Sequence, residues 1–272
     1  MFQRLAGFAF VMAMVLGGRS QLQSAAPTPT DVAGPVIREE QNIVVNGISE
    51  QWRLEWKTTP KPSCALGDAS SAASCPCTGF AYGESGELNL VRLTNDREID
   101  RLDLTPFFDG ESPDRGAATL QRWEPQEKDL DELGSDSFLA HVRARPLAKI
   151  MRFADYNHDG TSAEFFLQTG VEPCGKIVGI VVGVTPSQPR LQAFATSDHP
   201  EKPLVMQRKD WDALLKATGS IDVMDWQCGD HGSETETDIT LSAPNGGIRA
   251  VRREFECTES GNRGRLLHQQ VL

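Results

Sequence analysis

The sequence predicts an all-β protein with mainly antiparallel sheets and one short helix near residues 208–218. About ten segments show either alternation of apolar and polar residues or a short β-branched run, whereas one segment keeps helical spacing. Turn residues separate these segments at short intervals, which is typical of a sandwich or of a partial, propeller-like set of sheets.

The composition excludes some classes of function. The chain has 272 residues, 38 of them acidic and 27 basic, and its formal net charge is −11. Such an acidic chain lacks the clustered basic surface that non-specific nucleic-acid binding requires. Hydrophobic residues make up 39% of the chain, which is enough to build a core. We therefore predict a single β-rich domain over residues 41–272 and no nucleic-acid partner.

The N-terminal 26 residues have the pattern of a secretory signal peptide. Arg4 precedes an apolar run from Leu5 to Gly18, and small residues follow as far as Ala26. A retained membrane anchor is the alternative. No later stretch contains 18 consecutive apolar residues, so no membrane span is expected after signal removal. We predict export to the periplasm or the extracellular space, with residues 27–40 as a flexible lead-in rich in Pro, Thr and Gly.

Two hairpins are predicted next. Ile43–Val45 is followed by Asn46-Gly47, a pair that favours a tight type I′ turn, and then by a strand in which Trp52, Leu54 and Trp56 alternate with charged residues. Residues 79–82 and 87–93 form the second predicted hairpin, with Glu84-Ser85-Gly86 as its turn.

Six cysteines form an even set, which outside the cytosol indicates disulfide bonds. We predict that Cys228 pairs with Cys257. The remaining four would form two further bridges, partly within the loop at residues 61–77; these are Cys64, Cys75, Cys77 and Cys174.

Residues 98–136 combine an excess of acids with Pro106, Pro113 and Pro125. This composition predicts a solvated, loop-rich excursion, and a cation-collecting surface is the alternative.

The rest of the chain continues in strands around one helix. Strands are predicted at 149–154, 164–168 and 191–196, and the apolar run 177–184 is typical of a strand covered on both faces. Trp211, Leu214, Leu215 and Thr218 keep helical spacing, with Gly219 as the cap. Two final strands, at 238–242 and 248–257, flank a turn at 244–247.

One acidic segment carries the ligand pattern of a divalent cation site. Asp155, Asn157 and Asp159 place oxygen ligands on alternate residues, and Gly160 allows a sharp reversal that turns the Thr161 carbonyl inward. Glu164 then supplies a closing carboxylate. We predict one structural Ca²⁺ with these ligands: Asp155, Asn157, Asp159, Thr161 and Glu164. An ion-free Asx-rich turn is the alternative.

The Asp-x-Asn-x-Asp-Gly start is similar to an EF-hand loop, but the twelfth position holds Phe166 instead of an acid. The strand context more closely resembles the calcium loops of FG-GAP and VCBS repeats, over about residues 151–175. That resemblance implies that Asp155, Asn157 and Asp159 are the first three ligands. The family's closing acid falls at Ala163, one residue before Glu164.

No familiar catalytic motif is present, and the histidines are not paired at metal-ligand spacing. The leading hypothesis is an exported, non-catalytic β-rich protein with a structural calcium loop, serving as a binding or adhesion module for a cell-surface or protein ligand. A secreted hydrolase with a site built from scattered acids or from His199 or His231 is the second hypothesis. A purely structural protein with an ion-free turn is the third.

Overall fold

A computed structural model describes residues 34–63, 83–108, 116–124, 144–172 and 176–272, apart from the side chain of His231. The predicted signal peptide, the strand at 79–82 and four of the six cysteines lie outside these residues. Within them, no helix has the length and apolar character needed to span a membrane.

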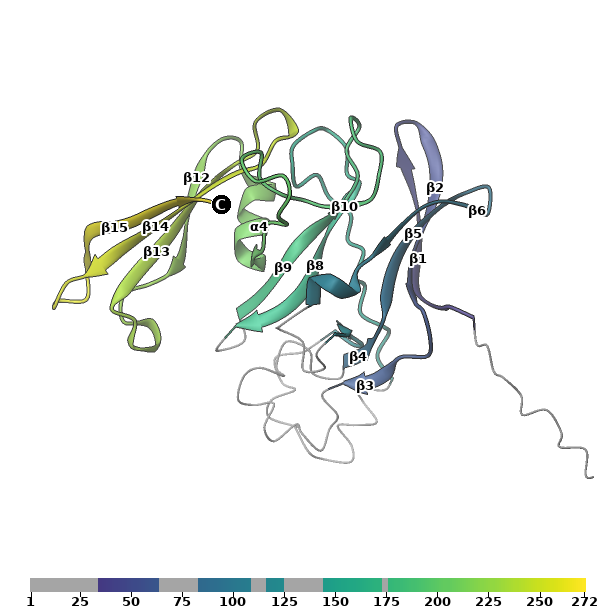
Figure 1. The fold of residues 1–272 in the computed structure, drawn as a ribbon, viewed down its shortest axis with the longest axis horizontal. Coiled ribbons are helices and arrows are strands. Elements are labelled where there is room, and N and C mark those ends of the chain that lie inside the picture. Colours follow the sequence, from purple (N-terminus) through teal and green to yellow (C-terminus); the bar gives the residue numbers. More distant parts are fainter. Residues whose placement is uncertain (1–33, 64–82, 109–115, 125–143, 173–175) are drawn as a thin grey trace, which may run out of the picture. The chain divides into compact units, whose positions relative to one another are not determined.

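The described strands form four antiparallel sheets (Figure 1). The first has the order β1 (Val36–Val45), β2 (Ile48–Trp56), β5 (Leu88–Thr94) and β6 (Arg97–Asp103), and a small sheet joins β3 (Lys61–Ser63), β4 (Gly83–Gly86) and β7 (Ala118–Gln121). In the third, β9 (Lys176–Gly183) pairs with β8 (Glu164–Glu172), β10 (Gln192–Ala193) and β11 (Met206–Gln207). The fourth runs β12 (Ile221–Trp226), β13 (Thr235–Ser242), β14 (Arg249–Cys257) and β15 (Arg263–Val271).

Short helical elements complete the described fold: the helix α4 (Arg208–Lys216) and the 3₁₀ turns η3 (Thr105–Phe108), η5 (Asp230–Gly232) and η6 (Pro244–Gly246). The predicted all-β class with one short helix is therefore confirmed. The sheets of the described residues form neither a closed barrel nor a propeller.

The first hairpin matches its sequence signal. β1 and β2 pair up to Val45 and Ile48, and Asn46 and Gly47 between them have φ values of 51° and 79°. A type I′ turn requires positive φ at both positions, which Asn and Gly adopt at low cost. The alternating side chains of Trp52, Leu54 and Trp56 are all buried, as predicted.

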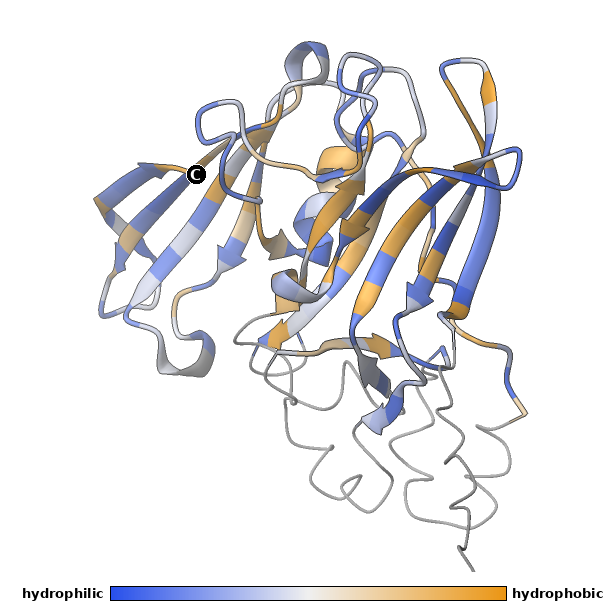
Figure 2. Ribbon diagram, turned by 45° about the vertical axis from the view of Figure 1, so that its right-hand side comes forward, coloured by the Kyte–Doolittle hydropathy of each residue, from blue (hydrophilic) through white to orange (hydrophobic). Residues whose placement is uncertain are grey.

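The strand pair β8–β9 separates two hydrophobic cores. Phe165 and Val182 belong to one cluster with residues of β1, β2, β5 and β7, while Phe166 and Val181 belong to another with residues of α4, β13 and β14. Adjacent side chains on a strand point to opposite faces, so both faces of β8–β9 are covered. This explains why hydrophobic residues run along β9 with few interruptions, whereas β14 and β15 are largely hydrophilic (Figure 2).

The predicted disulfide between Cys228 and Cys257 is confirmed, with a Cα–Cα distance of 5.7 Å. It ties the segment after β12 to the last residue of β14. The fourth sheet is thereby cross-linked at one end.

The structure corrects the predicted lead-in. β1 begins at Val36, so residues 36–40 belong to a strand instead of a flexible segment. Arg38 is buried and forms an ion pair with Glu84, and it donates to the carbonyl oxygens of Gln121 and Ala148. These partners are distant in sequence, and composition alone does not reveal them.

The loop-rich excursion at 98–136 is also corrected where it is described. It contains most of β6, together with η3 and β7, because Leu104, Phe108 and Leu120 are buried in the first core. Local charge is therefore a poor guide to a segment in which a few apolar residues are buried in the core.

Other predicted elements also differ in the structure; the strand predicted at 191–196, for example, is reduced to the two residues of β10 followed by isolated bridges. Glu84-Ser85-Gly86 lies within strand β4 and is not a turn, since it pairs with both β3 and β7. Residues 149–154 are not a strand; they form only a bridge at Ala154. The helix is capped at Ala217, two residues before the predicted Gly219.

Candidate metal centre

The acidic loop at residues 155–164 begins and ends at one antiparallel bridge. The Ala154 amide donates to the Glu164 carbonyl at 2.8 Å, and the Glu164 amide donates to the Ala154 carbonyl at 3.3 Å. Two buried side chains hold the loop from opposite sides. Tyr156 packs edge-to-face on Trp211, with ring centroids 6.1 Å apart, and Ala163 lies in the first core. The loop is thus fixed to both cores of the protein.

Asp155 and Asp159 organise the backbone inside the loop. The two carboxylate oxygens of Asp155 accept from the amides of Asp159 at 3.0 Å and Gly160 at 2.9 Å. One oxygen of Asp159 accepts from the Thr161 amide at 2.9 Å, and the other accepts from the Asn157 side-chain amide at 2.8 Å. His158 and Gly160 have φ values of 58° and 89°, which produces the reversal that the sequence predicts at Gly160.

Glu164 is the buried member of the group. Its side chain is 0% exposed, and one oxygen accepts from the Tyr156 amide at 2.7 Å. The other oxygen, Oε1, accepts no hydrogen bond from any residue that the structure describes. An unpaired buried carboxylate oxygen costs free energy unless a donor or a cation compensates it.

Gly183 makes room for this carboxyl group. It pairs with Glu164 across β8–β9, and a Cβ atom at Gly183 would lie 2.3 Å from the Ala163 carbonyl oxygen and 2.9 Å from Glu164 Cγ. No side chain fits there without moving the Glu164 backbone. Sequence reasoning missed Gly183, although an isolated glycine inside a β-branched run is a known sign of close approach.

The three carboxylates converge. Each of Asp155, Asp159 and Glu164 offers an oxygen atom, and these atoms all lie within 4.8 Å of one another. Burial raises the pKa of the Glu164 carboxyl to about 8, the Tyr156 amide opposes this shift, and the negative charges of Asp159 and Asp155 add to it. A cation at the centre of the group would offset both the cost of burying the Glu164 carboxylate and its repulsion by Asp155 and Asp159.

The structure brings together three of the five predicted ligands as carboxylates and places the Asn157 side chain in contact with the third acid, Asp159. Thr161 joins through its amide, which donates to Asp159; a carbonyl ligand at Thr161 remains a prediction. Hard oxygen ligands of this kind suit Ca²⁺, Mg²⁺ and Mn²⁺, whereas softer metals prefer sulfur and imidazole.

Comparisons with protein-family models, with curated proteins and with solved structures find no match for the chain.

Proposed function

We propose that this chain is an exported, non-catalytic β-rich protein in which residues 155–164 hold one structural calcium ion. The observation that carries the proposal is the buried Glu164 carboxylate: one of its oxygens accepts no hydrogen bond from the described residues, and it offers an oxygen within 4.8 Å of oxygens of Asp155 and Asp159. Ordinary acidic turns expose their carboxylates to water, which costs nothing. A fully buried acid beside two others is costly, and a resident cation removes that cost.

Calcium is favoured over magnesium because the loop supplies its oxygens from an irregular backbone bend. Ca²⁺ accepts six to eight oxygens in flexible geometry, whereas Mg²⁺ requires a near-ideal octahedron and keeps several waters. The proposed ligands are Asp155, Asn157, Asp159, the Thr161 carbonyl and Glu164, in the manner of an FG-GAP or VCBS loop. Weak affinity suffices outside the cell, where calcium is abundant.

The ion would fix the loop between the two cores, which is a structural role. We further propose that the module binds a cell-surface or protein ligand. The acidic net charge and the disulfide between Cys228 and Cys257 support a protein that works outside the cytosol.

Calorimetric titration of the metal-stripped protein tests the ion. Ca²⁺ should bind with one-to-one stoichiometry and should bind more tightly than Mg²⁺. At a concentration ten times its Kd it should stabilise the fold by about 1.4 kcal/mol. Asp159→Ala should abolish binding because it removes one converging carboxylate and the hydrogen bonds that shape the loop.

Glu259→Gln is the matched control, since Glu259 is an exposed acid in the turn between β14 and β15. It should bind Ca²⁺ as the unmodified chain does. Unchanged melting with and without chelator, together with unchanged melting of Asp159→Ala, would remove the ion from the proposal.

Export is tested separately. Mass spectrometry of the protein recovered from the producing cells should show loss of the N-terminal signal peptide, residues 1–26, and the protein should be in the extracytoplasmic fraction. An intact N-terminus in the cytosol would contradict export while leaving the calcium proposal standing.

A further inference from the structure

A pocket of about 430 Å³ lies between the β9 sheet and the β12–β15 sheet, beside the start of α4. Its volume falls in the range of small-molecule sites. Val178 of β9, Met206 of β11 and Ile239 of β13 contribute apolar walls. We call it the Asp210 pocket, after the acid at its polar end.

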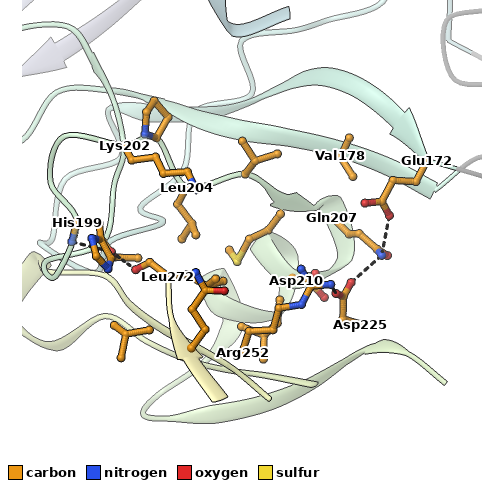
Figure 3. Close-up of a pocket in the computed structure, with 17 residues that line it drawn as sticks. Glu172, Val178, His199, Lys202, Leu204, Gln207, Asp210, Asp225, Arg252 and Leu272 are labelled. Atoms are coloured by element: carbon orange, nitrogen blue, oxygen red, sulfur yellow. Dashed lines mark hydrogen bonds and ion pairs between the residues drawn. The ribbon is translucent and has the colours of Figure 1, made fainter. Parts of the chain in front are cut away.

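Hydrogen bonds organise the polar end (Figure 3). The Gln207 side-chain amide donates to Glu172 at 3.1 Å and to Asp225 at 2.8 Å, and the Arg252 guanidinium donates to the other oxygen of Asp225 at 2.8 Å. Asp225 is therefore compensated by a cation and by an amide. The Gln207 side-chain NH₂ group thus donates to both acids that flank it.

Asp210 lies at the same end but has no such compensation. Its side chain is 0% exposed, and neither carboxylate oxygen has a hydrogen-bond partner of normal geometry among the described residues; the nearby Gln207 backbone amide only partly offsets the effect of burial on its pKa. Lys209, the adjacent cation, donates to the carbonyls of Met224 and Asp225, while Arg252 is bound to Asp225. A carboxyl group that lines a cavity and lacks a partner there marks the place where a ligand's donor fits.

The arrangement selects among ligand classes. An anion at the polar end would meet the acidic side chains of Asp210, Asp225 and Glu172, whereas Lys202 lines the pocket on the side away from Asp210 (Figure 3). A bare metal ion would need converging oxygens, and within the described residues only the 155–164 loop brings three acids within 4.8 Å. An ammonium group on a carbon chain needs one carboxylate, further hydrogen-bond acceptors and apolar walls, and the pocket offers all three.

We propose that the Asp210 pocket binds a small organic cation, a primary amine with an aliphatic body. Its ammonium group donates to Asp210, and its chain packs against Val178, Met206 and Ile239. This site uses none of the proposed calcium ligands, so the amine proposal does not depend on the calcium proposal.

The probe is hexylammonium, titrated into isotopically labelled protein in saturating calcium and followed by NMR. Amide shifts should concentrate at residues 206–210 and on β9 and β13, and the titration should saturate. Hexanoate should produce no such shifts, because its charge is repelled. Methylammonium should bind at least about tenfold more weakly, because it lacks the chain that fills the apolar part.

Asp210→Asn tests the assigned acid. The change is isosteric and removes a buried charge, so the fold is retained, and the affinity for hexylammonium should fall about tenfold or more. Asp212→Asn is the matched control, because Asp212 lies on the same helix but lines a different hollow; its affinity should be unchanged.

Three results would overturn the proposal: hexylammonium shifts scattered over the acidic surface, equal binding of hexanoate, or full affinity in Asp210→Asn. Circular dichroism of each variant separates loss of binding from loss of fold.

Discussion

The 155–164 loop and the Asp210 pocket each bury an acidic side chain, but they differ in how the neighbouring acids are placed around it. Each contains a fully buried acid with at least one oxygen that no described residue hydrogen-bonds. In the loop, the neighbouring acids come from adjacent residues and converge within 4.8 Å. In the pocket, the neighbouring acids Glu172 and Asp225 come from distant segments and are bridged by the Gln207 side chain. The comparison teaches that spacing, more than charge, decides whether an acidic site suits a bare ion or an organic cation.

The largest expected effect concerns the close packing that the loop requires and the pocket does not. Gly183→Ala places a Cβ atom 2.3 Å from the Ala163 carbonyl oxygen, so strand β8 has to shift. The free energy of unfolding should fall by about 3 kcal/mol, as measured by denaturant titration. Calcium affinity should fall in the same variant because Glu164 moves with its backbone.

Gly219→Ala is the control, because a Cβ atom at Gly219 contacts nothing within 4 Å and its φ angle is ordinary. Its stability should be within about 0.5 kcal/mol of the unmodified chain. Equal stability of the two variants would show that the tight Gly183–Glu164 approach does not hold in solution.

An intermediate effect is expected from the pocket, through pH. Burial raises the pKa of Asp210 to about 7; the charge of Lys209 and the Gln207 backbone amide oppose this shift, and the charges of Asp225 and Glu172 add to it. Arg252, which lies nearby, is paired with Asp225. Because the folded chain binds this proton more tightly than the unfolded chain does, stability falls as pH rises from about 4 to about 7 and then levels off.

Asp210→Asn removes that contribution. The variant's stability relative to the unmodified chain should rise by about 2 kcal/mol across this pH window, as measured by urea unfolding at several pH values. A difference that does not change with pH would mean that Asp210 titrates normally and is open to water.

The smallest expected effect is that of substituting Glu164, whose influence on stability should change sign when calcium is added. Without calcium at pH 7, Glu164→Gln should stabilise the fold by about 1 kcal/mol, because it removes an acid that is ionised in the unfolded chain but is held protonated in the fold by burial and by the charges of Asp159 and Asp155. With saturating calcium it should destabilise by a similar amount, because a ligand is lost. Thermal melts with and without chelator report both values, and the same sign in both conditions would contradict a resident cation.

Local signals predicted the fold class and several of its elements, although β6, β12 and β15 were not predicted. The Asn46-Gly47 turn, the β9 run and the helix around Trp211 each depend on neighbouring residues, and the structure contains all three. Elements defined by distant partners were missed or mistaken. The start of β1 depends on the buried pair Arg38–Glu84, and β4 owes its strand geometry to neighbours on both sides.

The two sites differ in the same respect: local sequence predicts one of them, and only the fold reveals the other. The acids of the loop stand close together in the sequence, so their convergence could be predicted. Gly183, which makes room for Glu164, is far along the chain and is recognised only when the strands are paired. Asp210 lies in the first turn of α4, a place where carboxylates are common, so its position in the sequence gives no sign of a site. Only the fold reveals that it faces a cavity.

The strand pair β8–β9 forms a wall of both hydrophobic cores, and this has a consequence for how the protein melts. Neither core can lose its packing without exposing the opposite face of the shared wall, so the two halves should denature as one cooperative unit. A single calorimetric transition is the expected signature, and substitutions in either half should displace that one peak.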